Sequence, residues 1–508
     1  MGCIPAAAPT PTVRIAGKLP ESALAGAGTR TPIYVVRALG LLGLLGILTT
    51  LFLVSAGAAS TPTEYVPART GGWPAWLAGP LHGLDLGLSG GSFQTLMLIM
   101  CASYALVLVG ARALPMKALA GTIVAANVIL LLGPPLISQD VFGYLAFARL
   151  GALHGLDPYT HVPAEAPTDQ VFRFIGWPFQ NSPYGPLFTL VSYAITPLGL
   201  AGGLWAFKAI AVTSSLGAVT LIARAAARLG QSARWAAAFV GLNPVMLVLA
   251  VGGAHNDTLL VLALAVALLL TAGTASAPEA GRAGLHLRAG AGALVAGVGI
   301  KLTAGLALPF LILAPSRVRE RVRVALGAGA AILALAVIAI IGFGVHALGF
   351  LGAIGEQQQL VSTHSIPAET ARLVGLSGTP GWWRNLFVAG FLAVLAVQLW
   401  RTARGADWRV AAGWSTLALL ASTAWVLPWY AIWALPLAAV SSNRRLRAAT
   451  LLACAYAVLI HLTLADALLN PHVHNALAHV HLSLTGVRHG LKFASFQVLR
   501  DLQVDLRW

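Results

Sequence analysis

The sequence predicts an all-α protein that crosses a lipid bilayer many times, and three observations carry this prediction. Only 9% of the 508 residues are charged, whereas soluble domains carry about 25%. Apolar runs that approach or exceed the ~20 residues of a membrane-crossing helix recur along the chain, and they include 38–57, 93–111, 118–137, 256–273 and 324–344. These runs lack the apolar–polar alternation of membrane barrel strands, so helices are the expected elements.

The positive charge of the chain indicates membrane topology rather than nucleic-acid binding. A net charge of +16 would suggest a nucleic-acid partner in a soluble protein. Here the basic residues lie in short loops between apolar runs, which is the pattern of cytoplasmic loops. The clusters are Arg112/Lys117, Arg224/Arg228/Arg234, Arg282/Arg288, Arg317/Arg319/Arg321/Arg323, Arg401/Arg404/Arg409 and Arg444/Arg445/Arg447. The lipid bilayer is therefore the expected partner, and nucleic acid is not.

Placing these clusters in the cytoplasm fixes the order of crossings. Runs 34–57, 93–111 and 118–137 then cross outward, inward and outward, so that 138–185 becomes an outer loop. The run 186–199 is short and ends near Pro197, so we expect it to lie at the outer interface or to dip in and back. The expected total is about eleven crossings, or about thirteen if 289–314 makes two.

Two apolar runs are expected to be broken. The run 289–314 is flanked by basic clusters and could form two very short helices around Lys301, and 410–440 is interrupted at Leu427-Pro428. Broken helices are tolerated in a membrane only where protein or a water-filled cavity covers the freed backbone. An internal cavity is therefore expected. The loops 138–185, 251–256 and 345–382 would meet the second break on the outer side.

The chain divides into three parts on this reading. Residues 1–32 are rich in Ala, Pro, Thr and Gly without apolar periodicity, which predicts a disordered cytoplasmic tail. The membrane-embedded domain covers 33–465, and 466–508 is expected to be a C-terminal tail on the outer face. Cys3, Cys101 and Cys454 have no metal-ligand spacing, and the sequence contains no P-loop or dinucleotide fingerprint, so neither a metal site nor a cofactor is expected.

Asp140 is the first candidate for chemistry. It lies at the outer end of an apolar run, in SQDVFGY, where a carboxylate is costly unless it is solvated or paired. The alternative is a plain helix start, for which Ser138 and Asp140 are suitable residues. The turn-forming HGLDPYTHVP and SPYGPL segments follow and would shape either a substrate pocket or a structural plug.

The segment GGAHND at 252–257 is the second candidate, because His255, Asn256 and Asp257 open an apolar helix. Asn256 or Asp257 would serve as an N-cap, which is the alternative to a functional role. A helix N-terminus also attracts anions such as phosphate. The charge of Asp257 would oppose that binding.

Three further features complete the candidates. Lys301 lies within an apolar run, where a charged lysine costs about 2.5–3.5 kcal/mol, so it must reach the interface, form a pair or face a cavity. His364 lies in the outer segment EQQQLVSTHSIP, and a solvated loop residue is its alternative. Trp429 and Tyr430 would be interfacial belt residues or would stack on a sugar ring.

Taken in order, the motifs SQDVFGY, HGLDPYTHVP, NSPYGPL, GGAHND, IKLTAGLALPF and LPWYAIWALP resemble one family. It comprises the actinobacterial polyprenol-phosphate-mannose-dependent α-1,6-mannosyltransferases of the C-type glycosyltransferase superfamily, and the resemblance covers roughly 34–465. It implies a C-type architecture whose outer loops form the active site at the outer face of the cytoplasmic membrane. It also implies transfer of mannose from a polyprenyl-phosphate donor to a mannan or glycolipid acceptor, with Asp140 at the catalytic aspartate position.

The chemistry of such a transfer needs only one carboxylate. A phosphate leaves as a stable anion, so no acid is required, and Asp140 would accept the acceptor hydroxyl proton while C1 is inverted. Lys301, His364, His255 and Arg149 are the candidates for binding the donor phosphate. The candidates for binding the acceptor or the sugar are Tyr144, Asp157, Tyr159, Tyr184, Asn256, Asp257, Trp429 and Tyr430.

Other functions remain open at this point. A transporter or flippase of lipid-linked sugars would also use broken helices and buried ionisable groups, but it usually shows paired halves. A non-catalytic assembly factor would not need Asp140. A transferase that uses an arabinofuranose donor would keep the same enzyme class.

Overall fold

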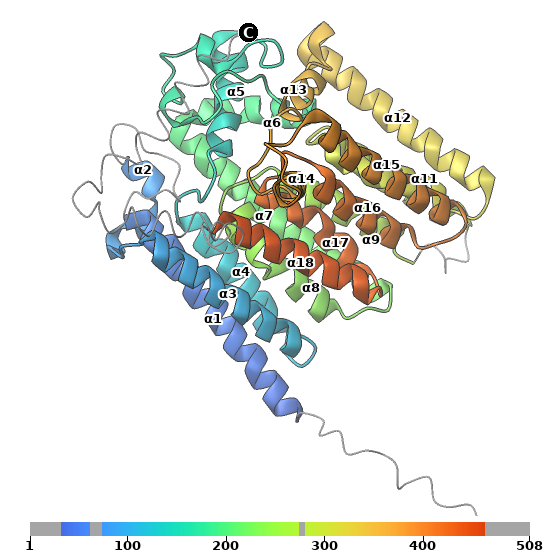
Figure 1. Cartoon of the computed structure of the whole chain (residues 1–508), viewed down its shortest axis with the longest axis horizontal. Helices are drawn as coiled ribbons and strands as arrows, with labels where there is room; N and C mark the ends of the chain where they lie inside the picture. Colours follow the sequence, from blue (N-terminus) through green and yellow to red (C-terminus); the bar gives the residue numbers. More distant parts are fainter. Residues whose placement is uncertain (1–31, 61–73, 274–279, 463–508) are drawn as a thin grey trace, which may run out of the picture.

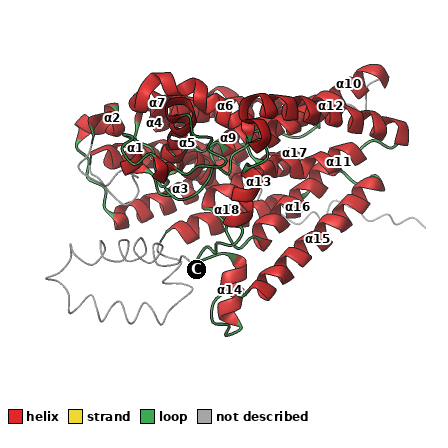
Figure 2. Cartoon of the chain, turned by 90° about the horizontal axis from the view of Figure 1, so that it is seen from above, coloured by secondary structure: helices red, strands yellow, loops and turns green. Residues whose placement is uncertain are grey.

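The computed structural model describes residues 32–60, 74–273 and 280–462. These residues form helices and connecting loops only, and Figures 1 and 2 show no strand in them. The predicted fold class is confirmed: the chain is a polytopic all-α membrane protein. The predicted tails 1–32 and 466–508 lie outside the described residues, apart from Pro32.

The first helices form a tight antiparallel group. The long α1 (Ile33–Ser60) packs along α3 (Gly90–Gly110), and α4 (Met116–Leu132) lies beside them. The short α2 (Ala75–Ala78) and η2 (Pro80–Leu84) occupy the connection after α1. A β-carbon at Gly43 of α1 would lie 2.5 Å from the carbonyl oxygen of Ser103, so a glycine is required for this close approach.

The second group begins with α5 (Asp140–His154), whose following loop contains η3 (Pro163–Glu165) and η4 (Phe172–Phe174). The predicted interfacial run 186–199 forms a separate ten-residue helix, α6 (Pro186–Ile195), which contacts α5 and α12 (Val318–Phe343). The turn η5 (Thr196–Leu198) and Gly199, at φ +70°, separate α6 from α7 (Gly199–Arg228). Next come α8 (Ala233–Gly241), the π-helical η6 (Val245–Val251) and α9 (Asp257–Thr271).

The remaining elements complete the bundle. They are α10 (Ala280–Val298), η8 (Leu302–Ala307), α11 (Leu308–Leu313), α12, η9 (Gly344–His346), α13 (Phe350–Gln357), α14 (Ile366–Leu373), α15 (Gly381–Ala403), α16 (Trp408–Ser422), η10 (Pro428–Ala434), α17 (Leu435–Val440) and α18 (Arg444–His461). Figure 2 shows α14 and α15 at the periphery of the bundle.

Five described helices are long and apolar enough to cross a membrane, and a sixth span results if the bent pair α8–η6 is counted as one. Four shorter apolar helical segments lie at 116–132, 257–271, 302–313 and 428–440. The predicted count of eleven to thirteen crossings therefore depends on short and broken helices, and it stays a prediction. Only 17% of the α12 window and 6% of the α15 window are buried in the protein, as expected of helices that face lipid.

Both predicted breaks are present. Lys301 lies between α10 and η8, and residues 423–427 separate α16 from η10. The freed carbonyl oxygens find partners nearby: Gly185 N donates to Ile300 O, and Phe188 N donates to Gly299 O. At the second break, Ser362 N donates to Ala424 O and its hydroxyl donates to Val426 O. Protein thus covers the interrupted backbone, as the membrane requires.

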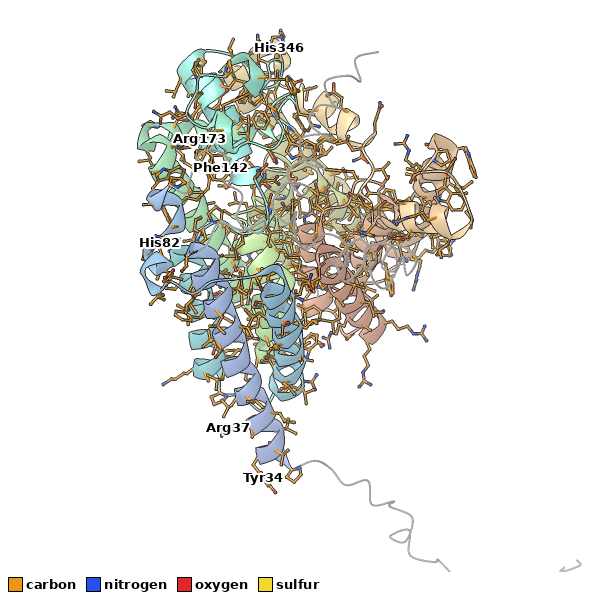
Figure 3. All side chains as sticks on the ribbon, turned by 60° about the vertical axis from the view of Figure 1, so that its left-hand side comes forward. Tyr34, Arg37, His82, Phe142, Arg173 and His346 are labelled. Carbon is orange, nitrogen blue, oxygen red and sulfur yellow. The ribbon has the colours of Figure 1, made fainter. Side chains whose placement is uncertain are left out.

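The two ends of the bundle differ in composition. Figure 3 shows Tyr34 and Arg37 at one end and Arg173 and His346 at the opposite end. Arginines of the predicted cytoplasmic clusters join neighbouring loops at the first end: Arg228 donates to Leu269 O, Arg234 to Leu114 O, Arg321 to Ala403 O and Arg447 to Gln231 Oε1. We call this the arginine end, and we call the opposite end, with the loop 138–185, the site end.

Candidate active site

Four segments that lie far apart in the sequence meet at the site end. They are the start of α5 with Asp140, the start of α9 with His255–Asp257, the first break with Lys301, and η10 with Trp429. Three of these segments are the ends of helices, which present polar side chains without a covering turn. The two broken helices therefore supply the site with a cation and with aromatic rings.

The loops before α5 and α9 are joined and strained. Leu136 N donates to Gly252 O over 2.9 Å and couples the two loops. Ile137 has φ +73° and Ala254 has φ +54°, a left-handed region that residues other than glycine rarely occupy and a β-branched residue occupies least. Strain of this kind persists where the surroundings fix it, and it gathers at functional sites.

Asp140 faces the outside of this cluster, and His255 lies behind it. The Oδ2 atom of Asp140 is 3.3 Å from Nδ1 of His255, with side-chain exposures of 17% and 0%. The imidazole stacks on the Trp429 indole, with ring centroids 3.8 Å apart. A β-carbon at Gly253 would lie 2.6 Å from His255 Nε2, so this position must be glycine for the ring to fit.

The Asp140 carboxyl group is held ionised. Burial raises its pKa, but His255, the charge of Lys301 and the Ser138 hydroxyl together outweigh burial, and the pKa lies below its usual value. Among the groups that lower this pKa, His255 has the largest influence, with its Nδ1 atom 3.3 Å from the carboxylate. Ser138 Oγ also accepts a hydrogen bond from Asp140 N over 3.1 Å and so begins α5. Asp140 is therefore both a helix start and a carboxylate, so the two predicted readings of this residue are compatible.

Lys301 forms a buried ion pair with Asp257. Its Nζ lies 2.9 Å from each carboxylate oxygen of Asp257, and the Trp433 indole donates to Oδ1 over 2.6 Å. The ammonium group also lies 4.5 Å from the centre of the Tyr430 ring, a favourable cation–π distance. Lys301 is thus paired, and Asp257 offsets most of the positive charge that the sequence suggested for binding a phosphate.

Several buried polar groups near Asp140 have no hydrogen-bond partner among the described residues, although Nδ1 of His255 lies 3.3 Å from the Asp140 carboxylate. They are both ring nitrogens of His255, the Nδ2 atom of Asn256 and the indole Nε1 of Trp429. An unsatisfied buried polar group costs about 1–3 kcal/mol. Native structures keep few of them, so their gathering at one place indicates that a ligand completes their hydrogen bonds. Nearby, Asn256 N donates to the Tyr144 hydroxyl over 3.3 Å, which positions Tyr144 beneath the site.

A small hollow, partly open to solvent, lies against Asp140. Tyr184 lines it and meets the Tyr144 ring edge-on at a centroid distance of 4.9 Å. The walls come from the start of α5, the loop 163–184 and the end of α13.

Two candidates for binding the phosphate lie in ion pairs of their own and do not line this hollow. Arg149 Nε is 2.8 Å from Asp169, which His154 also contacts over 2.8 Å. His364 Nδ1 is 2.6 Å from Glu369. These pairs hold the loop after α5 and the start of α14, respectively.

Two candidates for binding sugar also have structural partners. Asp157 accepts a hydrogen bond from Tyr159 N over 2.9 Å and lies 3.2 Å from His346. The Tyr159 hydroxyl lies 3.0 Å from both Tyr184 O and Thr189 Oγ1. Both residues fasten the loop after α5 to its neighbours.

Sequence reasoning missed the polar wall of the hollow and one partner of Asp257. The missed residues are Gln139, Trp177, Gln180, Asn181, Gln357 and Trp433. Gln139 and Asn181 lie inside motifs that the sequence reading had singled out, and Gln357 lies in the Gln-rich run before His364. The sequence therefore showed amide side chains in or beside these motifs. Because amides are uncharged, their position near an apolar run did not indicate a functional role.

Fold and site together define a multi-pass α-helical membrane protein with a polar, carboxylate-centred site at one end of its helices. The chain belongs to the alpha-(1->6)-mannopyranosyltransferase family: the profile of that family's N-terminal domain matches residues 37–317, more than half of the chain. A profile described as the MptB C-terminal domain matches residues 377–487. Asp140, His255 and Lys301 fall within the first match, and Trp429 falls within the second.

Curated relatives agree with this assignment. The chain is 32% identical over 155 residues to alpha-(1->6)-mannopyranosyltransferase A of Corynebacterium glutamicum, covering 29% of the chain and 31% of the relative. It is 32% identical over 172 residues to the protein of the same name from Mycobacterium tuberculosis, covering 32% and 33%. It thus spans about a third of the length of these two relatives. No solved structure gives a significant match.

Proposed function

We propose that the protein is a membrane glycosyltransferase that moves mannose from a polyprenyl-phosphate donor to a mannan or glycolipid acceptor. The observation that carries this proposal is the partly exposed Asp140 carboxylate at the wall of the hollow. The names of the curated relatives support mannose as the sugar and an α-1,6 linkage.

Asp140 acts as the general base. It takes the proton of the acceptor hydroxyl as that oxygen attacks C1, the bond from C1 to the phosphate oxygen breaks, and the phosphate leaves with the electron pair. One displacement inverts the configuration at C1. An ionised carboxylate is the form that can accept this proton, and its lowered pKa keeps it in that form.

The departing phosphate is stabilised from the buried side of Asp140. Nε2 of His255, Nδ2 of Asn256 and Nε1 of Trp429 lack a hydrogen-bond partner among the described residues and offer hydrogen bonds there, while Lys301 presents the cationic end of its pair with Asp257. Tyr144, Tyr184 and Tyr430 frame the sugar. Arg149, His364, Asp157 and Tyr159 support the surrounding loops instead.

The site end faces the outside of the cytoplasmic membrane in this proposal. The support is the arginine end, whose basic loops are of the kind that stay in the cytoplasm. Lipid-linked donors then reach the site from the outer leaflet.

Replacing Asp140 tests the proposal. Purified Asp140→Asn, supplied with labelled polyprenyl-phosphate mannose and a short mannan acceptor, should lose about 10²–10⁴-fold in transfer rate, because the base is gone while the shape is kept. Asp85→Asn, an exposed carboxylate outside the site, is the matched control and should retain full activity. Near-normal turnover of Asp140→Asn would remove Asp140 from the mechanism.

Two further measurements distinguish the proposed mannosyltransferase from an arabinofuranose transferase and from a flippase. Transfer of arabinofuranose in preference to mannose by the wild type would keep the enzyme class and change the donor. Movement of intact donor across a vesicle membrane without formation of a glycosidic bond would instead identify a flippase.

A further inference from the structure

The hollow beside Asp140 is built by three segments that meet only in the folded protein. Its polar lining includes Gln139, Asp140, Trp177, Gln180, Asn181 and Gln357, together with Tyr184. The first two lie at the start of α5, the next three in the loop before α6, and Gln357 at the end of α13. Side chains from three separate elements thus converge on one partly open space beside Asp140.

The charge of this lining selects the type of ligand. Asp140 is the charged residue of the hollow, and no Lys, Arg or His is among its described lining residues. A phosphate would meet a carboxylate there without a compensating cation, so the hollow disfavours an anion. A neutral ligand with hydroxyl groups suffers no such repulsion.

The amide side chains have free hydrogen-bonding capacity. Within the described residues, no hydrogen bond engages the side-chain amides of Gln139, Gln180 or Gln357. Asn181 donates through Nδ2 to His161 O over 3.2 Å, which leaves its Oδ1 atom to accept. An amide offers both donors and an acceptor, and a hydroxyl offers one donor and two lone pairs, so each group can donate to the other or accept from it.

Two walls of the hollow are held in place. A β-carbon at Gly176 would lie 2.3 Å from the Oε1 atom of Gln139, so the absence of a side chain there makes room for this amide. The Trp177 ring meets the Trp425 ring edge-on, with centroids 5.7 Å apart, and Trp177 remains 39% exposed. An exposed indole of fixed orientation offers an apolar face to the C–H groups of a sugar ring.

We infer that this hollow is the acceptor subsite and that it binds the neutral, hydroxyl-rich end of a mannose-containing glycan through the amides of Gln139, Gln180, Asn181 and Gln357. The inference rests on the proposed transferase function, since Asp140 is the wall shared by the two substrates. The acceptor hydroxyl reaches Asp140 from the hollow, and the donor phosphate lies on the side of His255 and Lys301.

The test is a separation of the two substrates in steady-state kinetics. In Gln357→Ala, the KM for a short α-linked manno-oligosaccharide should rise about tenfold, which corresponds to about 1.4 kcal/mol, while the KM for polyprenyl-phosphate mannose changes less than about twofold. Gln358→Ala is the matched control, because this exposed neighbour does not line the hollow. Gly176→Ala should also raise the acceptor KM by displacing Gln139. A raised donor KM with an unchanged acceptor KM in Gln357→Ala would overturn the inference.

A direct binding measurement tests the acceptor subsite independently of the transferase reaction. The full-length protein should bind the manno-oligosaccharide alone, without donor, and Gln357→Ala should weaken that binding while leaving binding of polyprenyl phosphate unchanged. Equal binding of the oligosaccharide by the wild type and Gln357→Ala would overturn the acceptor assignment. If the oligosaccharide binds as expected but no sugar is transferred, the proposed reaction fails and the neutral-sugar subsite stands.

Discussion

The ion pairs in the loops of the arginine end differ from the Asp257–Lys301 pair at the site end. At the arginine end, Glu320–Arg323 and Asp407–Arg409 pair side chains within three residues of each other, with exposures of 18–45%. At the site end, Asp257–Lys301 joins residues 44 positions apart, with exposures of 0% and 16%. Exposed pairs contribute about 0–1 kcal/mol, whereas a buried pair couples the packing of separate helices to the site. Charge thus forms exposed, local pairs in these loops and joins separate helices beside the site.

The largest effect is expected in an accessibility experiment that tests which end of the bundle faces the outside of the cell. In a Cys3→Ser background, Asp85→Cys marks the site end and Arg319→Cys marks the arginine end, and both positions are exposed. A membrane-impermeant maleimide should label Asp85→Cys in intact cells and Arg319→Cys only after lysis. The buried Cys454 should give little background. The reversed pattern would place the site in the cytoplasm.

The next largest effect is expected from the buried pair. Lys301→Ala leaves Asp257 buried without its cation, so the free energy of unfolding in detergent should fall by about 3–5 kcal/mol. Arg409→Ala removes an exposed pair at the other end and should cost no more than about 1 kcal/mol.

A double-mutant cycle sharpens this prediction. Lys301→Met combined with Asp257→Leu should be less destabilised than the sum of the single variants, because no lone charge remains. Additive losses would show that the two side chains do not stabilise each other.

A smaller, pH-dependent contribution to the stability of the protein is expected from Asp169, whose ion pairs hold the loop after α5. Burial raises its pKa, but Arg149, the Val171 amide and His154 together lower it below its usual value. Because the folded pKa is depressed, the stabilisation is complete above the unfolded value of about 3.9 and is lost as the pH falls through the folded pKa.

The measurement for Asp169 is the thermal midpoint of wild type and Asp169→Asn between pH 7 and pH 3. The wild type should be more stable at pH 7, and the two midpoints should converge in acid. A gap that stays constant over the whole range would show that the ionised carboxylate contributes nothing. Asp85→Asn again serves as the exposed control.

Much of the fold could be predicted because a bilayer imposes simple rules. Apolar runs marked the helices, and Lys301 and Leu427-Pro428 marked two of the breaks that the structure contains. The gathering of the basic loops at one end followed from their charge alone. The number of crossings could not be settled in this way, because short segments such as 302–313 and 428–440 follow no length rule.

The site was predicted less completely, for physical reasons. Asp140, His255 and Lys301 attracted attention because charge in an apolar context is costly. The pairing of Lys301 with Asp257 was not foreseen, since contacts across 44 residues depend on how α9 and α10 pack. The amides of Gln180 and Gln357 have neither charge nor periodicity, so only their convergence in space makes them notable.

The Asp257–Lys301 pair also bears on how the chain enters the bilayer during synthesis. Asp257 begins α9 and Lys301 follows α10, so the two charges belong to consecutive helices. Alone, each would oppose partition from the translocon into lipid by about 2.5–3.5 kcal/mol if it reached the bilayer centre. A hairpin of α9 and α10 that leaves the translocon as one unit carries no net charge from this pair. The integration of α9 then depends on residues that the ribosome adds more than forty positions later.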